Sequence, residues 1–158
     1  MEKILDRFLR YVAVDTQSDP DSESQPSSAK QLNLLKMLRD ELKAMGIEAE
    51  LDEYGYVMAG IPANIDTDAP AVGFIAHVDT SPDASGKDIR PQIISGYDGS
   101  DIPLKGVPGL SLKVAEFPEL GDYKGQTLVT TDGTTLLGAD DKAGVAEIMC
   151  MAEYVMTH

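Results

Sequence analysis

Apolar residues recur at three- and four-residue intervals in three stretches of the chain, and this spacing predicts three helices. The first helix is predicted over residues 2–14. The second is predicted over residues 28–46, where Ser28 and Gln31 fit a capping box. The third begins within residues 138–144. The apolar positions predicted to face the core are Ile4, Leu5, Phe8, Leu9 and Val12, then Leu35, Leu38, Leu42 and Met45, then Val145, Ile148, Met149, Ala152, Val155 and Met156.

Between the second and third helices the pattern changes to short apolar runs that predict strands. Residues 71–76 are almost wholly apolar, which predicts a strand buried on both faces. Helices alternating with buried strands favour an α/β fold, with a mixed sheet flanked by helices. The remaining predictions are a hairpin from 47–51 and 56–63, a strand at 126–131, and a loop region at 82–126 with short strands at 91–94 and 110–115.

Composition narrows the functional classes. The 158 residues carry a formal net charge of −14, which would repel the phosphates of nucleic acids and the surface of an anionic membrane. No apolar run approaches the roughly 20 residues of a spanning helix, and the amphipathic N-terminus is not a signal peptide. The single cysteine, Cys150, excludes an internal disulfide. These features favour a cytoplasmic protein.

The first candidate for chemistry is the tripeptide from His77 to Asp79, directly after the apolar run 71–76. Residues two apart in an extended chain project to the same face, so both side chains can enter one crevice at a strand end. A neutral imidazole binds zinc, and a nearby carboxylate can orient it. The alternative is a strand-end histidine beside a turn-forming aspartate, and the tripeptide alone does not decide between them.

The second candidate is the heptapeptide Gly-Ala-Asp-Asp-Lys-Ala-Gly at 138–144. Its adjacent carboxylates, Asp140 and Asp141, can attract a divalent cation, and one carboxylate can bridge two ions. The alternative is that they stabilise a helix N-terminus, with Lys142 as a solvated counter-charge. Because both candidates fall at strand ends, they could converge on a metal ion.

Two longer motifs contain these candidates: FIAHVDTSPD at 74–83 and TLLGADDKAGVAEIM at 135–149. Together they resemble the peptidase T family, the tripeptide aminopeptidases among the di-zinc exopeptidases. The similarity continues through DRFLRYVAVDTQSD near the start, SGKDIRPQII and GQTLVTTDG, and so covers nearly the whole chain. It implies the fold of the N-terminal part of a zinc-exopeptidase catalytic domain.

The resemblance also implies roles for individual residues. His77 matches a ligand of one zinc ion, Asp79 the catalytic aspartate that holds this histidine, and Asp140 the carboxylate that bridges two zinc ions. Asp141 and Lys142 would be supporting residues. The peptide bond after the bridging aspartate is often cis in relatives, which places the expectation between Asp140 and Asp141. A glutamate would act as general base, and the substrates would be tripeptides that lose their N-terminal residue.

One departure from the family pattern is large. The family carries its general base in a Glu-Glu pair beyond the 138–144 motif, followed by further ligands and a final histidine. This sequence has no Glu-Glu pair, and His158 lies at the wrong place for the final histidine. The expectation for residues 1–158 is therefore an incomplete catalytic domain without its lid or dimerisation domain. It would bind zinc weakly or partially and be inactive alone, whereas the complete enzyme would hold two zinc ions and form a homodimer.

Two alternatives to a tripeptide aminopeptidase stay open at this point. The parent could be another di-zinc enzyme, such as a carboxypeptidase or a deacylase. The chain could also be a non-catalytic acidic fragment that only binds a partner.

Overall fold

The computed structural model describes residues 2–66 and 68–158, which form two compact units. The first unit runs to Pro82 and resumes with Gly138–His158, and the second is Asp83–Leu137. In both units helices and short strands are mixed, as expected of an α/β protein. All three strand pairs found among the described residues are antiparallel and two-stranded, so the predicted mixed sheet is not formed there.

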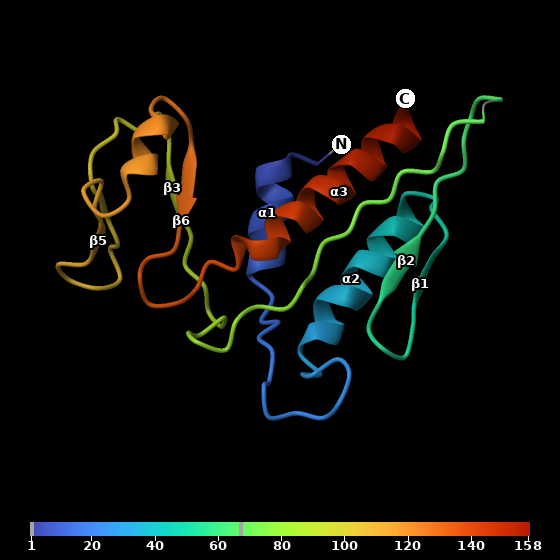
Figure 1. Cartoon of the computed structure of the whole chain (residues 1–158), viewed down its shortest axis with the longest axis horizontal. Helices are drawn as coiled ribbons and strands as arrows, with labels where there is room; N and C mark the ends of the chain where they lie inside the picture. Colours follow the sequence, from blue (N-terminus) through green and yellow to red (C-terminus); the bar gives the residue numbers. More distant parts are fainter. Residues whose placement is uncertain (1, 67) are drawn as a thin grey trace. The chain divides into compact units, whose positions relative to one another are not determined.

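The first unit contains the three predicted helices (Figure 1), and the first two are shorter than their sequence patterns suggested. Helix α1 (Ile4–Val12) lies against α3 (Ala139–Thr157), while α2 (Gln31–Ala44) packs on the hairpin of β1 (Ala49–Leu51) and β2 (Val57–Ala59). Glu50 pairs with Met58 at the centre of that hairpin, which confirms the predicted hairpin. The capping box is wrong, because α2 begins at Gln31 without a side-chain cap.

The core of the first unit follows most of the predicted apolar positions. The buried residues on the three helices are Phe8, Tyr11 and Val12, then Leu34, Leu35, Leu38 and Leu42, then Val145, Ala146, Met149 and Ala152. The prediction of burial was wrong near the ends of the first and third helices, where Ile4, Val155 and Met156 are exposed. Terminal turns of a helix have fewer neighbours to pack against, so periodicity alone overstates burial there.

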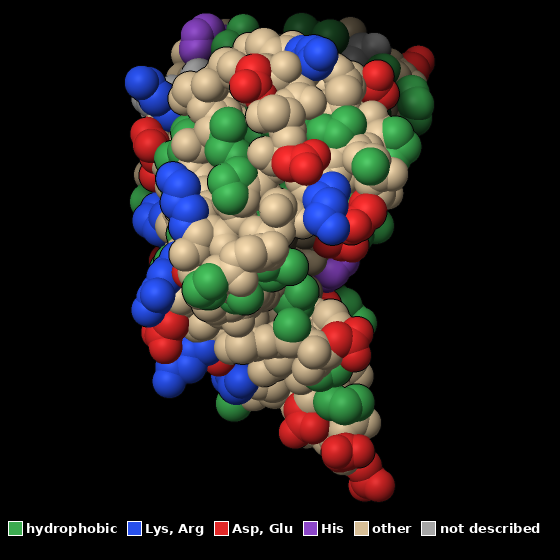
Figure 2. Space-filling model, turned by 90° about the vertical axis from the view of Figure 1, so that its left-hand side faces the viewer, with side chains coloured by type: hydrophobic (Ala, Val, Ile, Leu, Met, Phe, Trp, Pro, Cys, Tyr) green, Lys and Arg blue, Asp and Glu red, His purple; other side chains and the backbone are tan. Residues whose placement is uncertain are grey.

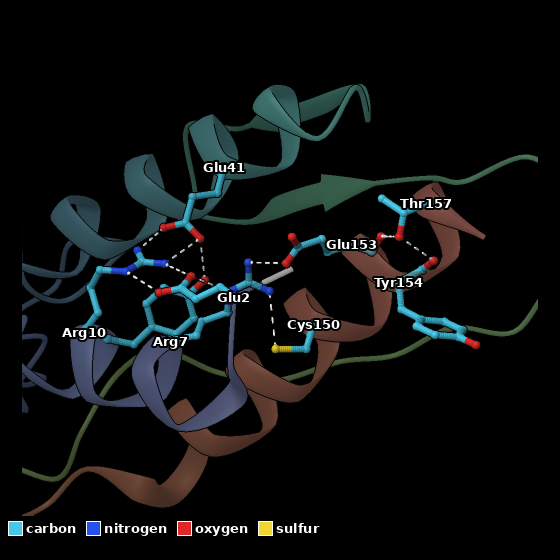
Figure 3. Close-up of polar contacts among 9 residues, drawn as sticks. Glu2, Arg7, Arg10, Glu41, Cys150, Glu153, Tyr154 and Thr157 are labelled. Atoms are coloured by element: carbon cyan, nitrogen blue, oxygen red, sulfur yellow. Dashed lines mark hydrogen bonds and ion pairs between the residues drawn. The ribbon is translucent and has the colours of Figure 1, made fainter.

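Ionic groups join the helices of the first unit, as Figure 3 shows. The buried Arg7 guanidinium on α1 donates to Glu2 Oε2 at 3.1 Å and to Glu153 Oε2 on α3 at 2.8 Å. On the side facing α2, the buried Tyr11 hydroxyl donates to Glu41 Oε2 at 2.6 Å, and Arg10 also binds the Glu41 carboxylate. Helix α1 is therefore tied to both of the other helices by charge-assisted hydrogen bonds.

The apolar run 71–76 does not form the predicted buried strand. Its residues are extended, Ile75 is 96% exposed, and Val72 and Phe74 are also exposed. A strand forms only when a neighbour takes its backbone hydrogen bonds, and within residues 2–66 and 68–158 the backbone of 71–76 makes none. The prediction was wrong because an apolar pattern predicts burial without identifying the pairing partner.

The second unit contains short strands in a region of loops. Strand β3 (Gln92–Ile94) pairs antiparallel with β6 (Leu128–Thr130), which confirms both predicted strands. A second pair joins β4 (Ile102–Pro103) to β5 (Ser111–Leu112), and the 3₁₀ helix η1 (Pro118–Tyr123) follows. No helix in the part of the chain that the structure describes has the length and apolar character needed to cross a bilayer.

Acidic residues outnumber basic ones in the sequence, but basic side chains also lie on the surface. In the view of Figure 2, lysine and arginine side chains lie among aspartate and glutamate side chains, with apolar groups between them. Mixed surface charge of this kind weakens long-range repulsion locally, because opposite charges within a few ångströms offset one another.

The Tyr11 hydroxyl allows a test of the contact between α1 and α2. Replacing Tyr11 with Phe leaves the buried ring but removes the donor to Glu41, so we expect the free energy of unfolding to fall by about 2 kcal/mol. Urea denaturation followed by circular dichroism measures this change. The exposed Tyr54, replaced by Phe, is the matched control and should change stability by less than about 0.5 kcal/mol. Equal effects of the two substitutions would contradict the assigned role of Tyr11.

Candidate functional site

The first part of the site is the segment that follows the apolar run and contains His77 and Asp79. This segment is held extended by Thr16 and Ser18, which lie just after α1. The Thr80 amide donates to the Thr16 carbonyl at 3.3 Å, and the Ser18 amide donates to the Thr80 carbonyl at 3.0 Å. A parallel bridge between Gln17 and Thr80 completes the contact.

The second part of the site is the turn at the start of α3. Gly138 has a φ of +76°, and a Cβ atom placed on it would lie 3.1 Å from Thr80 Cγ2. Glycine therefore permits both the left-handed turn and the close approach to the segment of His77. The peptide bond between Asp140 and Asp141 is cis, which confirms the expectation drawn from the resemblance.

The two adjacent acids of this turn have different surroundings. Asp141 Oδ1 accepts a hydrogen bond from the Gly144 amide at 3.2 Å, as the side chain of a helix N-cap does. The Asp140 side chain is 95% exposed, and its Oδ1 lies 3.0 Å from His77 Nε2. The helix-stabilising alternative therefore describes Asp141, whereas Asp140 faces the histidine.

His77 lies between two carboxylates. Its Nε2 faces Asp140, while its Nδ1 lies 3.1 Å from Asp79 Oδ1 and also 3.1 Å from the Asp79 carbonyl oxygen. Partial burial lowers the pKa of His77, but the hydrogen bond to Asp140 and the negative charge of Asp79 outweigh it, so its pKa is raised. Without a metal ion, this arrangement stabilises the imidazolium, which donates from both nitrogens.

Lys142 is not the solvated counter-charge that the sequence left open. Its side chain is 0% exposed, and Nζ donates to the Val14 carbonyl at 2.7 Å. Burial lowers the pKa of Lys142 to about 8, against the attraction of Asp15, which acts in the opposite direction. Lys142 thus attaches the first turn of α3 to the residues that follow α1.

The residues that the structure brings together fit part of a zinc site. An imidazole nitrogen and a carboxylate oxygen are both zinc ligands, and two ligands of one tetrahedral zinc lie about 3.3 Å apart. The observed 3.0 Å between His77 Nε2 and Asp140 Oδ1 is close to that separation. Among residues 2–66 and 68–158, however, no group of three or more His, Cys, Asp or Glu is placed to hold a metal ion. The described part of the chain therefore brings two donors, His77 and Asp140, together, fewer than a closed zinc site has.

Comparison with known proteins gives a consistent result. The chain is 54% identical over 157 residues to peptidase T of Macrococcus caseolyticus and 56% identical over 157 residues to that of Bacillus velezensis, in each case over 99% of this chain and 38% of the relative. It is 54% identical over 159 residues to peptidase T of Clostridium novyi, over 100% of this chain and 39% of the relative. The chain matches the N-terminal portion of peptidase T.

The match covers only part of each relative. The chain spans about two fifths of the curated relatives that it matches. No family model matches it. The comparison therefore shows which proteins this part of the chain is similar to, whereas the roles of individual residues have to be argued from the site.

Sequence reasoning identified the residues that meet at the site but missed those that hold them. Thr16 is fully buried, and its hydroxyl donates to the Val78 carbonyl at 2.6 Å. Val14 contributes only its carbonyl oxygen, so its side chain carries no signal of this contact. A threonine just after a helix has no distinctive spacing, and only the tertiary structure shows which carbonyl it reaches.

The environment of His77 predicts its titration in the metal-free chain. Its pKa should exceed 6.5, and Asp140→Asn should lower it because the substitution removes a negative charge from Nε2. Because the folded-state pKa is raised, this contact stabilises the fold fully below the unfolded pKa, and the stabilisation is lost as the pH rises through the folded pKa.

NMR titration of the imidazole protons measures this value. The sequence has two histidines, so His158→Gln assigns the signal of His77. Asp66→Asn, an exposed substitution elsewhere in the chain, is the control. An unchanged His77 pKa in Asp140→Asn would show that the carboxylate does not face the ring in solution.

Proposed function

We propose that this chain is the N-terminal part of the catalytic domain of a zinc-dependent aminopeptidase that releases the N-terminal residue from tripeptides. The supporting observation is that His77 and Asp140, 63 residues apart in sequence, face each other at 3.0 Å in a chain that matches peptidase T. Neither a core histidine nor a helix cap requires this contact. In this proposal the lid or dimerisation domain and the remaining ligands belong to the rest of the enzyme, which would act as a homodimer.

Each residue of the site has a proposed role. His77 would hold zinc through Nε2 in its neutral form, while its Nδ1–H is donated to Asp79, which orients the ring and raises its basicity. Asp140 would hold zinc through its exposed carboxylate, in the role of the bridging aspartate that the resemblance implies. Asp141 supports the site by capping α3, and Lys142 supports it by binding the Val14 carbonyl.

The chemistry supplied by bound zinc would be a lowered pKa of the attacking water and polarisation of the scissile carbonyl. Asp79 keeps the imidazole in the tautomer whose Nε2 lone pair points toward Asp140. A proton on Nε2 must leave before this nitrogen can bind a metal ion, so binding should strengthen as the pH rises through the raised pKa of His77. The general base is proposed to be a glutamate of the complete enzyme.

The proposed setting of this enzyme is the cytoplasm. A single cysteine is compatible with a reducing compartment. The net charge of −14 disfavours nucleic acid as a partner. Short peptides are the proposed substrates because the relatives are named peptidase T.

Zinc binding by the full 158-residue chain tests the proposed ligands. Equilibrium dialysis at pH 7.5, with bound metal measured by atomic emission, should show weak binding of about one zinc ion. His77→Ala should weaken it at least tenfold, because an outer partner of a metal ligand alone accounts for about 10- to 100-fold. His158→Ala is the matched control and should bind like the parent. Loss of binding in the control alone, or in neither variant, would refute the assignment of His77.

Substrate specificity is tested with the complete enzyme that contains this chain. Tripeptides with a free N-terminus should be cleaved after their first residue, and the same peptides with an acetylated N-terminus should resist cleavage. His77→Ala should lower kcat/KM by more than about 100-fold. Cleavage of the acetylated peptides would indicate a deacylase, and release of the C-terminal residue would indicate a carboxypeptidase.

A further inference from the structure

One five-residue segment, Val14 to Ser18, contacts both halves of the candidate site. It follows α1 directly and contains none of the proposed ligands. We infer that this segment is the positioning element of the site, in which the Thr16 hydroxyl holds the residues around Val78 and the Val14 carbonyl holds Lys142. The inference rests on the proposed function, because it concerns how the proposed zinc ligands are brought together.

The contact with the first half is made by Thr16. Its hydroxyl donates to the carbonyl oxygen of Val78, the residue between His77 and Asp79, at 2.6 Å. Both Thr16 and Val78 are buried, so water does not replace this bond. This carbonyl belongs to the peptide between Val78 and Asp79, so holding it restrains the short stretch of backbone from which the side chains of His77 and Asp79 project.

The contact with the second half is made through Lys142. Its ammonium group is buried and donates to the Val14 carbonyl at 2.7 Å, two residues before Thr16. Lys142 itself lies two residues after Asp140, on the turn that approaches Thr80 through Gly138. A displaced Val14 carbonyl would leave the ammonium group buried without this acceptor, which is costly.

The two contacts therefore involve residues that are two positions apart, Val14 and Thr16. The Thr16 contact reaches the neighbour of His77, and the Val14 contact reaches Lys142 near Asp140. Since only Asp15 separates Val14 from Thr16, the separation of their partners is limited as well. The hydrogen bonds of this segment thus hold His77 and Asp140, which are far apart in sequence, so that Nε2 and Oδ1 lie 3.0 Å apart.

Thr80 provides a matched control in the same region. Like Thr16 it is a buried threonine, with 3% exposure, but within the described residues its hydroxyl has no hydrogen-bond partner. Replacing either threonine with valine keeps the shape of the side chain and removes the hydroxyl. Only at Thr16 does the change also remove a hydrogen bond, and it leaves the Val78 carbonyl buried and unpaired.

The test measures zinc affinity of the full 158-residue chain by equilibrium dialysis, under conditions in which circular dichroism shows each variant to be folded. Thr16→Val should weaken zinc binding about 10- to 100-fold, as loss of an outer partner of a metal site does. Thr16→Ser, which keeps the hydroxyl, should restore binding to within about threefold, and Thr80→Val should bind like the parent. A role limited to overall stability would lower the urea midpoint of Thr16→Val without changing the zinc affinity of the folded protein.

The outcomes separate this inference from the proposed function. If Thr16→Val binds zinc like the parent while His77→Ala does not, the positioning role is overturned and the proposed ligands stand. If the parent and His77→Ala are equally unable to bind zinc, the proposed site is overturned, and the positioning role with it. If Thr16→Val does not fold, Thr16→Cys keeps a weak donor of similar size and should bind zinc with intermediate affinity. Parental affinity in Thr16→Cys overturns the inference.

Discussion

The buried ammonium group of Lys142 constrains the arrangement of the whole first unit. A charge removed from water needs a close acceptor, and the Val14 carbonyl supplies one at 2.7 Å. The start of α3 must therefore lie at the end of α1, wherever the other elements pack. Arg7 adds a second buried cation on the same pair of helices, with Glu153 of α3 as its partner at 2.8 Å. The two contacts determine both ends of the contact between α1 and α3.

This arrangement explains why two adjacent aspartates have different surroundings. Asp141 accepts a hydrogen bond from the amide of Gly144, three residues later, so its carboxylate stabilises the start of the regular helix. Asp140 lies in the first turn of α3 with a non-helical backbone (φ −87°, ψ 105°), and its side chain is left exposed beside His77. A carboxylate that no backbone amide holds is available to a cation, whereas a capping carboxylate is already satisfied. The same dipeptide thus joins a structural requirement to the proposed metal site.

The apolar segment 71–76 shows the limit of pattern-based prediction. Its composition is typical of a segment in the interior of a sheet, but none of the described residues pairs with its backbone, and Ile75 is 96% exposed. Hydrophobic periodicity measures what a segment would gain from burial and contains no information about which neighbour covers it. The helices were predicted better, because their hydrogen bonds lie within the segment itself and their apolar stripes need only one partner face.

The sequence by itself determined the three helices, the short hairpin and the resemblance to a known family. It also singled out three candidate site residues: His77, Asp79 and Asp140. These follow from local periodicity and from motifs that are contiguous in the chain. The resemblance already favoured Asp140 over Asp141 as the site residue. Only the tertiary structure showed that Asp140 faces His77 at 3.0 Å, that Lys142 is buried, and that Thr16 reaches Val78. The physical reason is that these are bonds between residues more than 60 positions apart, whose partners depend on how the helices pack and not on the residues next to them in sequence.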